Sequence, residues 1–232
     1  MPMYARDEAA DLRVVDRFPD GVGWQAHPEE GGCRTSHAIR DDDGGVWLVD
    51  PLDAPNVSDA YADLGEVVGV AVLADYHTRD AAVFAERHDV PVTVPTGLNR
   101  VVEQLDVPTR RVVDSVAGFE LRWLNPLRAW RETVAYRERD GTLYVPDVLS
   151  SGESFTVGRE RLAMNVLVRL SPPRATFADL DPERVIVGHG RGVFEDAEAA
   201  LSDAVGNARR RFPRALVSSG PREFRAMLDA VL

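Results

Sequence analysis

The sequence contains no lysine and a single cysteine, Cys33, in 232 residues. One cysteine excludes an intramolecular disulfide and any zinc cage built from several cysteines. No apolar run approaches the roughly 18 residues that a membrane span needs. The acidic opening "MPMYARDEAADLRVVDRF" lacks the apolar core of a signal peptide. We therefore predict a cytoplasmic chain without a membrane partner, in which Cys33 is a small, partly buried side chain.

The charge is strongly negative, because 38 acidic residues face 27 basic ones, all arginine, for a formal net charge of -11. This balance predicts no nucleic-acid partner, since phosphate contacts need clustered basic side chains. High acidity without lysine resembles proteins of salt-loving archaea, whose acidic surfaces stay hydrated in concentrated salt. In that setting the charge is an adaptation to solvent and identifies no partner.

Several common catalytic motifs are also missing. There is no Gly-x-Ser-x-Gly elbow, no P-loop, and no Gly-x-Gly-x-x-Gly after an apparent strand. The chain has no internal repeat and no long linker, and 44% of its residues are apolar. That composition is enough for one sizeable core. We therefore predict a single domain over residues 1–232.

The predicted elements change character along the chain. Short strands separated by Gly, Pro and Asp turns occupy residues 12–50. Helices and apolar strands then alternate up to about residue 106, and strands return over 110–149 with an Asp140-Gly141 turn. The remainder predicts a mixed, mostly helical segment at 159–184 that Pro172 and Pro173 break, a buried strand at 184–190, and helices at 193–212 and 221–232. This order favours a four-layer αββα sandwich of two mixed sheets with helices outside.

Four segments, together with this order, resemble the metallo-β-lactamase superfamily over roughly residues 12–215. They are "GVWLVDPLDA", "VLADYHTRDA", "TLYVPDVLS" and "VIVGHGRGVF". The second is similar to the His-x-His-x-Asp-His loop of that family, and the last two to the strands that deliver a bridging aspartate and a final histidine. The resemblance implies the αββα sandwich and a site for two zinc, iron or manganese ions that activate water for hydrolysis.

The resemblance also implies the ligand positions of this chain. It aligns one metal with Asp75, His77 and Asp147, and a second metal with Asp80, Asp147 and His189. Three protein ligands plus water is the usual count for a catalytic zinc. A set this rich in oxygen would also suit manganese, iron or magnesium.

Two arginines stand where the resemblance expects ligands. Arg79 replaces the aspartate of the loop, and Arg128 lies near the place of a histidine, with no histidine from 89 to 188. A guanidinium cannot bind a metal, but it pairs well with carboxylates. Our first hypothesis is therefore a degenerate site without metal, in which Arg79 and Arg128 replace the ions or bind a small anionic ligand. Such a chain would be a pseudoenzyme or a binding protein.

The alternative is a hydrolase of esters, thioesters or phosphodiesters with one divalent ion (zinc, manganese or iron) at an atypical Asp/His centre. The two hypotheses differ at Arg79, which would pair with Asp147 in the first and turn to solvent in the second. Simpler roles also exist: the glycines around His189 would serve a plain turn, and Asp147 could end a strand. Asp50, in "VDP", is predicted to be a structural acid that hydrogen-bonds the loops.

Overall fold

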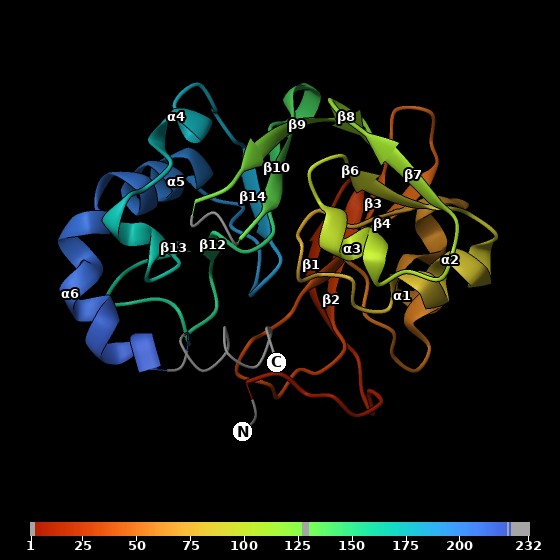
Figure 1. Ribbon diagram of the computed structural model, residues 1–232, viewed down its shortest axis with the longest axis horizontal. Helices are drawn as coiled ribbons and strands as arrows, with labels where there is room; N and C mark the ends of the chain where they lie inside the picture. Colours follow the sequence, from red (N-terminus) through yellow and green to blue (C-terminus); the bar gives the residue numbers. More distant parts are fainter. Residues whose placement is uncertain (1–2, 127–129, 222, 224–232) are drawn as a thin grey trace.

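The computed structural model describes residues 3–126, 130–221 and 223, and stacks two β-sheets face to face with helices on both outer sides (Figure 1). The larger sheet has the strand order β1-β2-β3-β4-β5-β6-β7, and the smaller has the order β14-β11-β10-β9-β8. Strands β12 and β13 form a separate pair. The predicted αββα sandwich of two mixed sheets is confirmed.

The elements have the following bounds. The larger sheet contains β1 (Arg13–Phe18), β2 (Gly21–Gln25), β3 (Ser36–Arg40), β4 (Val46–Val49), β5 (Val67–Ala71), β6 (Val92–Pro95) and β7 (Thr109–Val112). The smaller sheet contains β8 (Ser115–Val116), β9 (Phe119–Leu124), β10 (Glu132–Arg137), β11 (Thr142–Val145) and β14 (Arg184–Val187), and the short pair is β12 (Leu149–Ser150) and β13 (Ala163–Met164). The α-helices are α1 (Val57–Tyr61), α2 (Ala81–His88), α3 (Asn99–Glu103), α4 (Arg174–Phe177), α5 (Ala197–Gly206) and α6 (Ala208–Ser218), and the 3-10 helices are η1 (Ala62–Leu64), η2 (Glu138–Asp140) and η3 (Val168–Leu170).

Alternation along the strands divides the apolar side chains among the layers. In β10, Val134 joins the core under the helices α4 and α5, whereas its neighbour Ala135 joins the core between the sheets. In β11, Leu143 and Tyr144 divide in the same way. Successive side chains of a strand point to opposite faces, so each strand contributes to two cores. Strand β5 is apolar along most of its length because both of its faces are covered.

Helices complete the outer layers. Phe84 of α2 packs into the core on the outer face of the larger sheet, and Leu201 of α5 packs into the corresponding core of the smaller sheet. Each fully buried side chain of this size stabilises the fold by about 1.5–3 kcal/mol relative to an exposed one. The described helices include none with both the length and the apolar character that a bilayer span requires.

The predicted helical segment at 159–184 is wrong. Within it only η3 and α4 are helical, and Pro172 and Pro173 separate the two. The segment is instead organised by a buried ion pair, in which Arg169 donates to both carboxylate oxygens of Glu160 at 2.6 and 2.9 Å. The helix predicted at 193–212 is two helices, α5 and α6, which meet at Asn207. The helix predicted at 221–232 lies almost entirely outside the described residues.

The parallel pairs β4–β5 and β11–β14 determine where loops gather. The carboxyl ends of parallel neighbours meet at one edge of their sheet, where ligands bind in open α/β sheets. The turns that follow these four strands carry Asp50, His77, Asp147 and His189.

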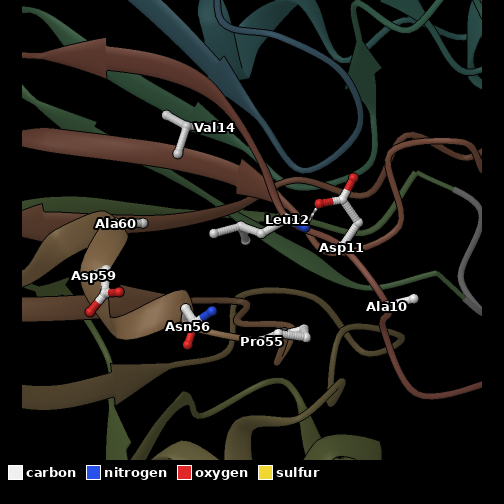
Figure 2. Close-up of a pocket in the computed structure, with 8 residues that line it drawn as sticks. All are labelled: Ala10, Asp11, Leu12, Val14, Pro55, Asn56, Asp59 and Ala60. Carbon is white, nitrogen blue, oxygen red and sulfur yellow. Dashed lines mark hydrogen bonds between the residues drawn. The ribbon is translucent and has the colours of Figure 1, made fainter.

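A shallow groove of about 450 Å³ lies elsewhere, beside β1 and α1 (Figure 2). It is lined by Ala10, Asp11, Leu12, Val14, Pro55, Asn56, Asp59 and Ala60.

The loop between β2 and β3 is held by a buried glutamate. Glu30 is 2% exposed and accepts hydrogen bonds from Arg34 Nε at 2.8 Å and Arg34 Nη2 at 2.7 Å. It also accepts the backbone N–H groups of Arg34 and Ala5. Burial alone would raise the pKa of Glu30, but the hydrogen bonds and charge of Arg34 lower it. The glutamate is therefore ionised and ties residue 5 to this loop.

A depressed pKa makes this contact pH-dependent. The contribution of Glu30 should be complete above the unfolded-state pKa of about 4.3 and should be lost as the pH falls through the lower folded-state value. We expect Glu30→Gln to lower the free energy of unfolding at pH 7. The difference in this free energy between wild type and variant should narrow below about pH 4.3. Urea unfolding across pH 3–7 measures this, with exposed Glu29→Gln as the control. A gap that stays constant over that range would contradict the assignment.

Candidate metal centre

Three side chains converge where the two sheets meet. His77 Nε2 and His189 Nε2 each lie 3.0 Å from Asp147 Oδ1, and the two nitrogens are 3.3 Å apart. Both histidines are buried, at 4% and 5% exposure, whereas the Asp147 side chain is 15% exposed. The cluster therefore meets solvent mainly through Asp147.

Each member comes from a different strand end. His77 lies in the turn from β5 to α2, Asp147 follows β11, and His189 follows β14. Gly188 permits this approach, because a Cβ there would lie 2.3 Å from Pro146 O and 2.9 Å from His77 Cε1. The glycine before His189 thus serves close packing against the His77 ring.

Both histidines are oriented through their other ring nitrogen. His189 Nδ1 lies 2.7 Å from Gly32 O, and His77 Nδ1 lies 2.9 Å from Asp50 Oδ2. A carbonyl oxygen can only accept, so His189 Nδ1 carries the proton and its neutral form presents a lone pair at Nε2. Such outer hydrogen bonds to carbonyls and carboxylates are typical of histidines that bind metals.

Asp50 hydrogen-bonds the loops, as predicted, and also orients the His77 ring. Its carboxylate accepts the Leu73 N–H at 2.9 Å, the Tyr144 hydroxyl, and His77 Nδ1. Burial alone would raise the pKa of Asp50, but the charge and hydrogen bond of His77 lower it. An ionised Asp50 fixes the His77 ring with Nε2 directed at the cluster.

The pKa shifts of His77, Asp147 and His189 leave the contact between His189 and Asp147 without a proton. Burial opposes ionisation of Asp147, but the charge and the hydrogen bond of His77 lower the pKa of this carboxyl. Burial and Arg79 oppose protonation of His77, yet Asp147 and Asp50 raise its pKa. Burial lowers the pKa of His189. A proton on His77 satisfies one contact of Asp147, whereas neutral His189 Nε2 and Asp147 Oδ1 face each other as two acceptors.

A divalent cation would satisfy all three atoms together. Protein nitrogen and oxygen ligands bind zinc at about 2.0–2.2 Å, which places tetrahedral ligand atoms roughly 3.3–3.5 Å apart. The observed separations of 3.0–3.3 Å are close to that spacing. Among the described residues, His77, Asp147 and His189 are the only group that meets the geometric criteria for holding a metal ion. The donor set therefore fits one ion.

Arg79 adopts neither of the two predicted arrangements, because it neither pairs with Asp147 nor turns to solvent. Its guanidinium donates to three backbone carbonyls, those of Thr35 (2.9 Å), Asp50 (2.7 Å) and Gly188 (3.1 Å). Its Nη2 lies 3.3 Å from His77 Nε2. Within the described part of the chain it forms no ion pair with Asp147 or Asp75, and its Nε has no hydrogen-bond partner. Arg79 therefore clamps three backbone segments beside the cluster and keeps its positive charge there.

The backbone around the cluster is strained. Cys33, Asp50 and Arg79 have backbone φ values of 47°, 47° and 43°, which residues other than glycine rarely adopt. Each such residue costs of order 1–3 kcal/mol, and such residues concentrate at functional sites. Three of them on the loops that surround one cluster favour a functional role for it.

The other predicted ligands lie apart from this cluster. Asp75 is buried, and burial raises its pKa against the opposing charges of Arg131 and Arg100. Asp80 occupies the N-cap position of α2 without a side-chain capping bond, and its Oδ2 instead accepts the Asp53 N–H at 2.7 Å. Arg128 lies outside the described residues. The structure thus brings together His77, Asp147 and His189, which combine one ligand from the first predicted set, one from the second, and the shared aspartate.

Sequence reasoning missed Glu132, at the start of β10. This fully buried glutamate accepts Trp130 Nε1–H at 3.0 Å and the backbone N–H groups of Asp147 and Val148. Burial and then the charge of Asp147 raise the pKa of Glu132 to about 8. It positions the turn that carries Asp147. A glutamate at the start of a strand has no distinctive sequence pattern, so only the fold reveals that Glu132 positions the Asp147 turn.

Tyr144→Phe tests the support behind His77. The change removes the hydroxyl donated to Asp50 and leaves a buried carboxylate short of one partner. We expect the free energy of unfolding to fall by about 1–3 kcal/mol. Urea denaturation measures this, with Tyr136→Phe as the control, because the Tyr136 hydroxyl bonds Asp181 O at an exposed position. Equal, negligible losses in both variants would show that Asp50 does not depend on Tyr144.

Comparison with known proteins places the fold. No family model and no curated protein matches the sequence. Solved structures do match: a metallo-β-lactamase of Hirschia baltica has a TM-score of 0.61 at 13% identity, covering 85% of this chain and 97% of its own. A Pseudomonas aeruginosa metallo-β-lactamase in its mono-zinc form has 0.54 at 13%, covering 88% and 99%. A mutant flavo di-iron protein of Thermotoga maritima has 0.56 at 13%, covering 85% and 62%.

These likenesses define the class of structure. The chain has the metallo-β-lactamase fold, as its sequence motifs predict. Identities of this size establish the fold alone, and the same fold can carry different chemistry. Any activity must therefore be argued from the cluster.

Proposed function

We propose that this chain is a hydrolase that uses one divalent metal ion, held by His77, Asp147 and His189. The observation that carries the proposal is the convergence of three atoms of metal-ligating type, two imidazole nitrogens and one carboxylate oxygen, within 3.3 Å of one another. Both histidines direct Nε2 inward because their Nδ1 atoms are bonded to Asp50 and Gly32. The contact between His189 Nε2 and Asp147 Oδ1 brings two buried acceptors together, which is costly without a cation.

The protein groups would divide the work as follows. A bound divalent ion would activate water and polarise a carbonyl or phosphoryl oxygen. Asp50 and Gly32 hold the imidazoles in orientation, and Glu132 holds the turn of Asp147. Both histidine contacts of Asp147 use Oδ1, so Oδ2 is not engaged by the histidines and could accept a proton. Ester, thioester and phosphodiester substrates all suit this chemistry.

One ion agrees better with the structure than two. A second centre would need ligands from Asp80 or Asp75, and both lie apart from the cluster. Arg79 also brings a permanent positive charge to the place where the family resemblance expects a carboxylate. Two histidines and one carboxylate with open positions suit catalytic zinc or non-haem iron. Among the proteins of the same fold, one is described in a mono-zinc form and one as a di-iron protein.

Hydrolysis by metal-free and metal-loaded protein tests the function. The chain is freed of metal with chelator, reloaded with zinc, manganese or iron(II), and assayed on ester, thioester and phosphodiester substrates. We expect turnover of one class only after loading, and its loss in His189→Gln. His88→Gln is the matched control, because His88 ends α2 away from the cluster. Turnover that ignores the metal, or survives in His189→Gln, would refute the proposal.

The second candidate is a non-catalytic protein with a degenerate, metal-free site that binds a small anion or nothing. It is favoured by Arg79, whose Nη2 lies 3.3 Å from His77 Nε2 and competes with a cation there. Against an anion-binding role, four of the five guanidinium N–H groups already face the carbonyls of Thr35, Asp50 and Gly188 or the His77 ring. This candidate predicts no metal binding by wild type.

A further inference from the structure

A short segment, Met3–Ala5, crosses the loop between β2 and β3 beside the cluster, and we call it the strap. Met3 O accepts the Gly32 N–H at 2.7 Å. Ala5 donates its N–H to Glu30 Oε2 at 2.9 Å, and its carbonyl accepts Arg34 Nη2 at 2.8 Å. The strap has no regular secondary structure, so these three bonds to one loop determine its place.

The strap places an aromatic ring against a cluster histidine. The Tyr4 ring meets the His189 imidazole edge to face, with centroids 6.0 Å apart. The guanidinium of Arg34 lies over the same ring at 5.4 Å. Gly32 allows the approach, because a Cβ there would lie 2.3 Å from Tyr4 Cε1. Tyr4 is thus packed between the ion pair that holds the strap and a proposed metal ligand.

One residue, Gly32, connects the strap to His189. Gly32 donates its N–H to Met3 of the strap, and its carbonyl accepts His189 Nδ1 at 2.7 Å. The residue whose carbonyl orients the ligand is therefore also the residue whose N–H anchors the strap. Burial and then the charge of Asp147 raise the pKa of Tyr4, so the phenol stays neutral beside the cluster.

We propose that Tyr4 is a positioning residue of the metal centre, which holds His189 in its ligating orientation and shields it from solvent through the strap. The inference rests on the proposed metal site and adds a part of the chain that no strand of the sandwich supplies. Coupling of this kind is reciprocal. A strap that favours the metal-ligating orientation must itself be stabilised when a metal binds.

The rate of metal loss to excess chelator tests this inference. Cobalt(II) or zinc is loaded, and Tyr4→Ala is expected to release it at least about tenfold faster than wild type, as outer contacts of metal sites typically tune affinity 10–100-fold. Tyr4→Phe should stay within about twofold, because the ring contact is retained. Glu30→Gln frees the strap and should also speed release, whereas exposed Glu29→Gln should not.

A second readout uses the metal-free protein. Tyr4→Ala should move the NMR signal of the His189 ring protons and speed hydrogen exchange at the Gly32 amide, with Tyr4→Phe close to wild type. Metal release at the wild-type rate in both Tyr4→Ala and Glu30→Gln would overturn the inference while leaving the metal site standing. A wild-type chain that binds no metal would overturn both.

Discussion

Asp147→Asn should lower the affinity of the chain for a divalent ion by about 100-fold or more. Asp147 is the one carboxylate of the cluster, and its Oδ1 contacts both histidines at 3.0 Å. Structural zinc sites of four ligands bind with about 10–16 kcal/mol, or about 2.5–4 kcal/mol per ligand, which corresponds to a change in affinity on the order of 100-fold or more. Asparagine keeps the size of the side chain and removes the charge, which separates ligation from packing.

Competition with a chromophoric chelator measures this affinity in wild type and variant. Asp179→Asn is the matched control, because Asp179 is an exposed acid that pairs with Arg122 at the surface. Asp147→Asn should also lose the metal-dependent hydrolysis, while Asp179→Asn should retain both properties. Equal affinities in wild type and Asp147→Asn would remove Asp147 from the ligand set.

Arg79→Met should change two properties in opposite directions. Removing a fixed positive charge beside His77 should raise the affinity for a dication about tenfold or more. Removing the clamp should leave the carbonyls of Thr35, Asp50 and Gly188 without their donor. Hydrogen bonds to charged groups contribute about 1.5–3 kcal/mol each, so the loss of all three should lower the free energy of unfolding by about 4.5 kcal/mol or more.

The two effects are measured separately, by chelator competition and by urea unfolding of the metal-free protein. Arg122→Met is the control, since Arg122 forms an exposed ion pair with Asp179 and should alter neither property greatly. Lower metal affinity in Arg79→Met would mean that the arginine supports the centre. Unchanged stability would mean that the three carbonyl contacts carry little energy.

Much of the fold could be predicted because local patterns and tertiary structure agree. The apolar run at β5, the Gly-rich turn after β14 and the turn acid Asp50 all indicate strand ends where the fold has them. The segment at 159–184 could not be predicted, because its order comes from the buried pair of Arg169 and Glu160, nine residues apart. Helical spacing alone does not distinguish such a segment from a helix.

The site was predictable only in part for the same reason. His77, Asp147 and His189 each follow a strand, so a motif with the right order can identify them. Asp75 and Asp80 share the loop of His77, and sequence order cannot say which of its side chains turn inward. Arg79 was predicted to pair with carboxylates, but its guanidinium donates to backbone carbonyls of the surrounding loops instead. Glu132 and Tyr4 join the site through tertiary packing from distant segments, which no local pattern records.

The number of metal ions bound per chain tests the central claim most directly. Protein purified without chelator, and the metal-free form titrated with zinc, manganese and iron(II), should be analysed by elemental mass spectrometry and calorimetry. We predict one equivalent, lost in Asp147→Asn and His189→Gln and retained in His88→Gln. Zero equivalents under all conditions would contradict the account and favour a metal-free site, and two would show that Arg79 does not exclude the second ion.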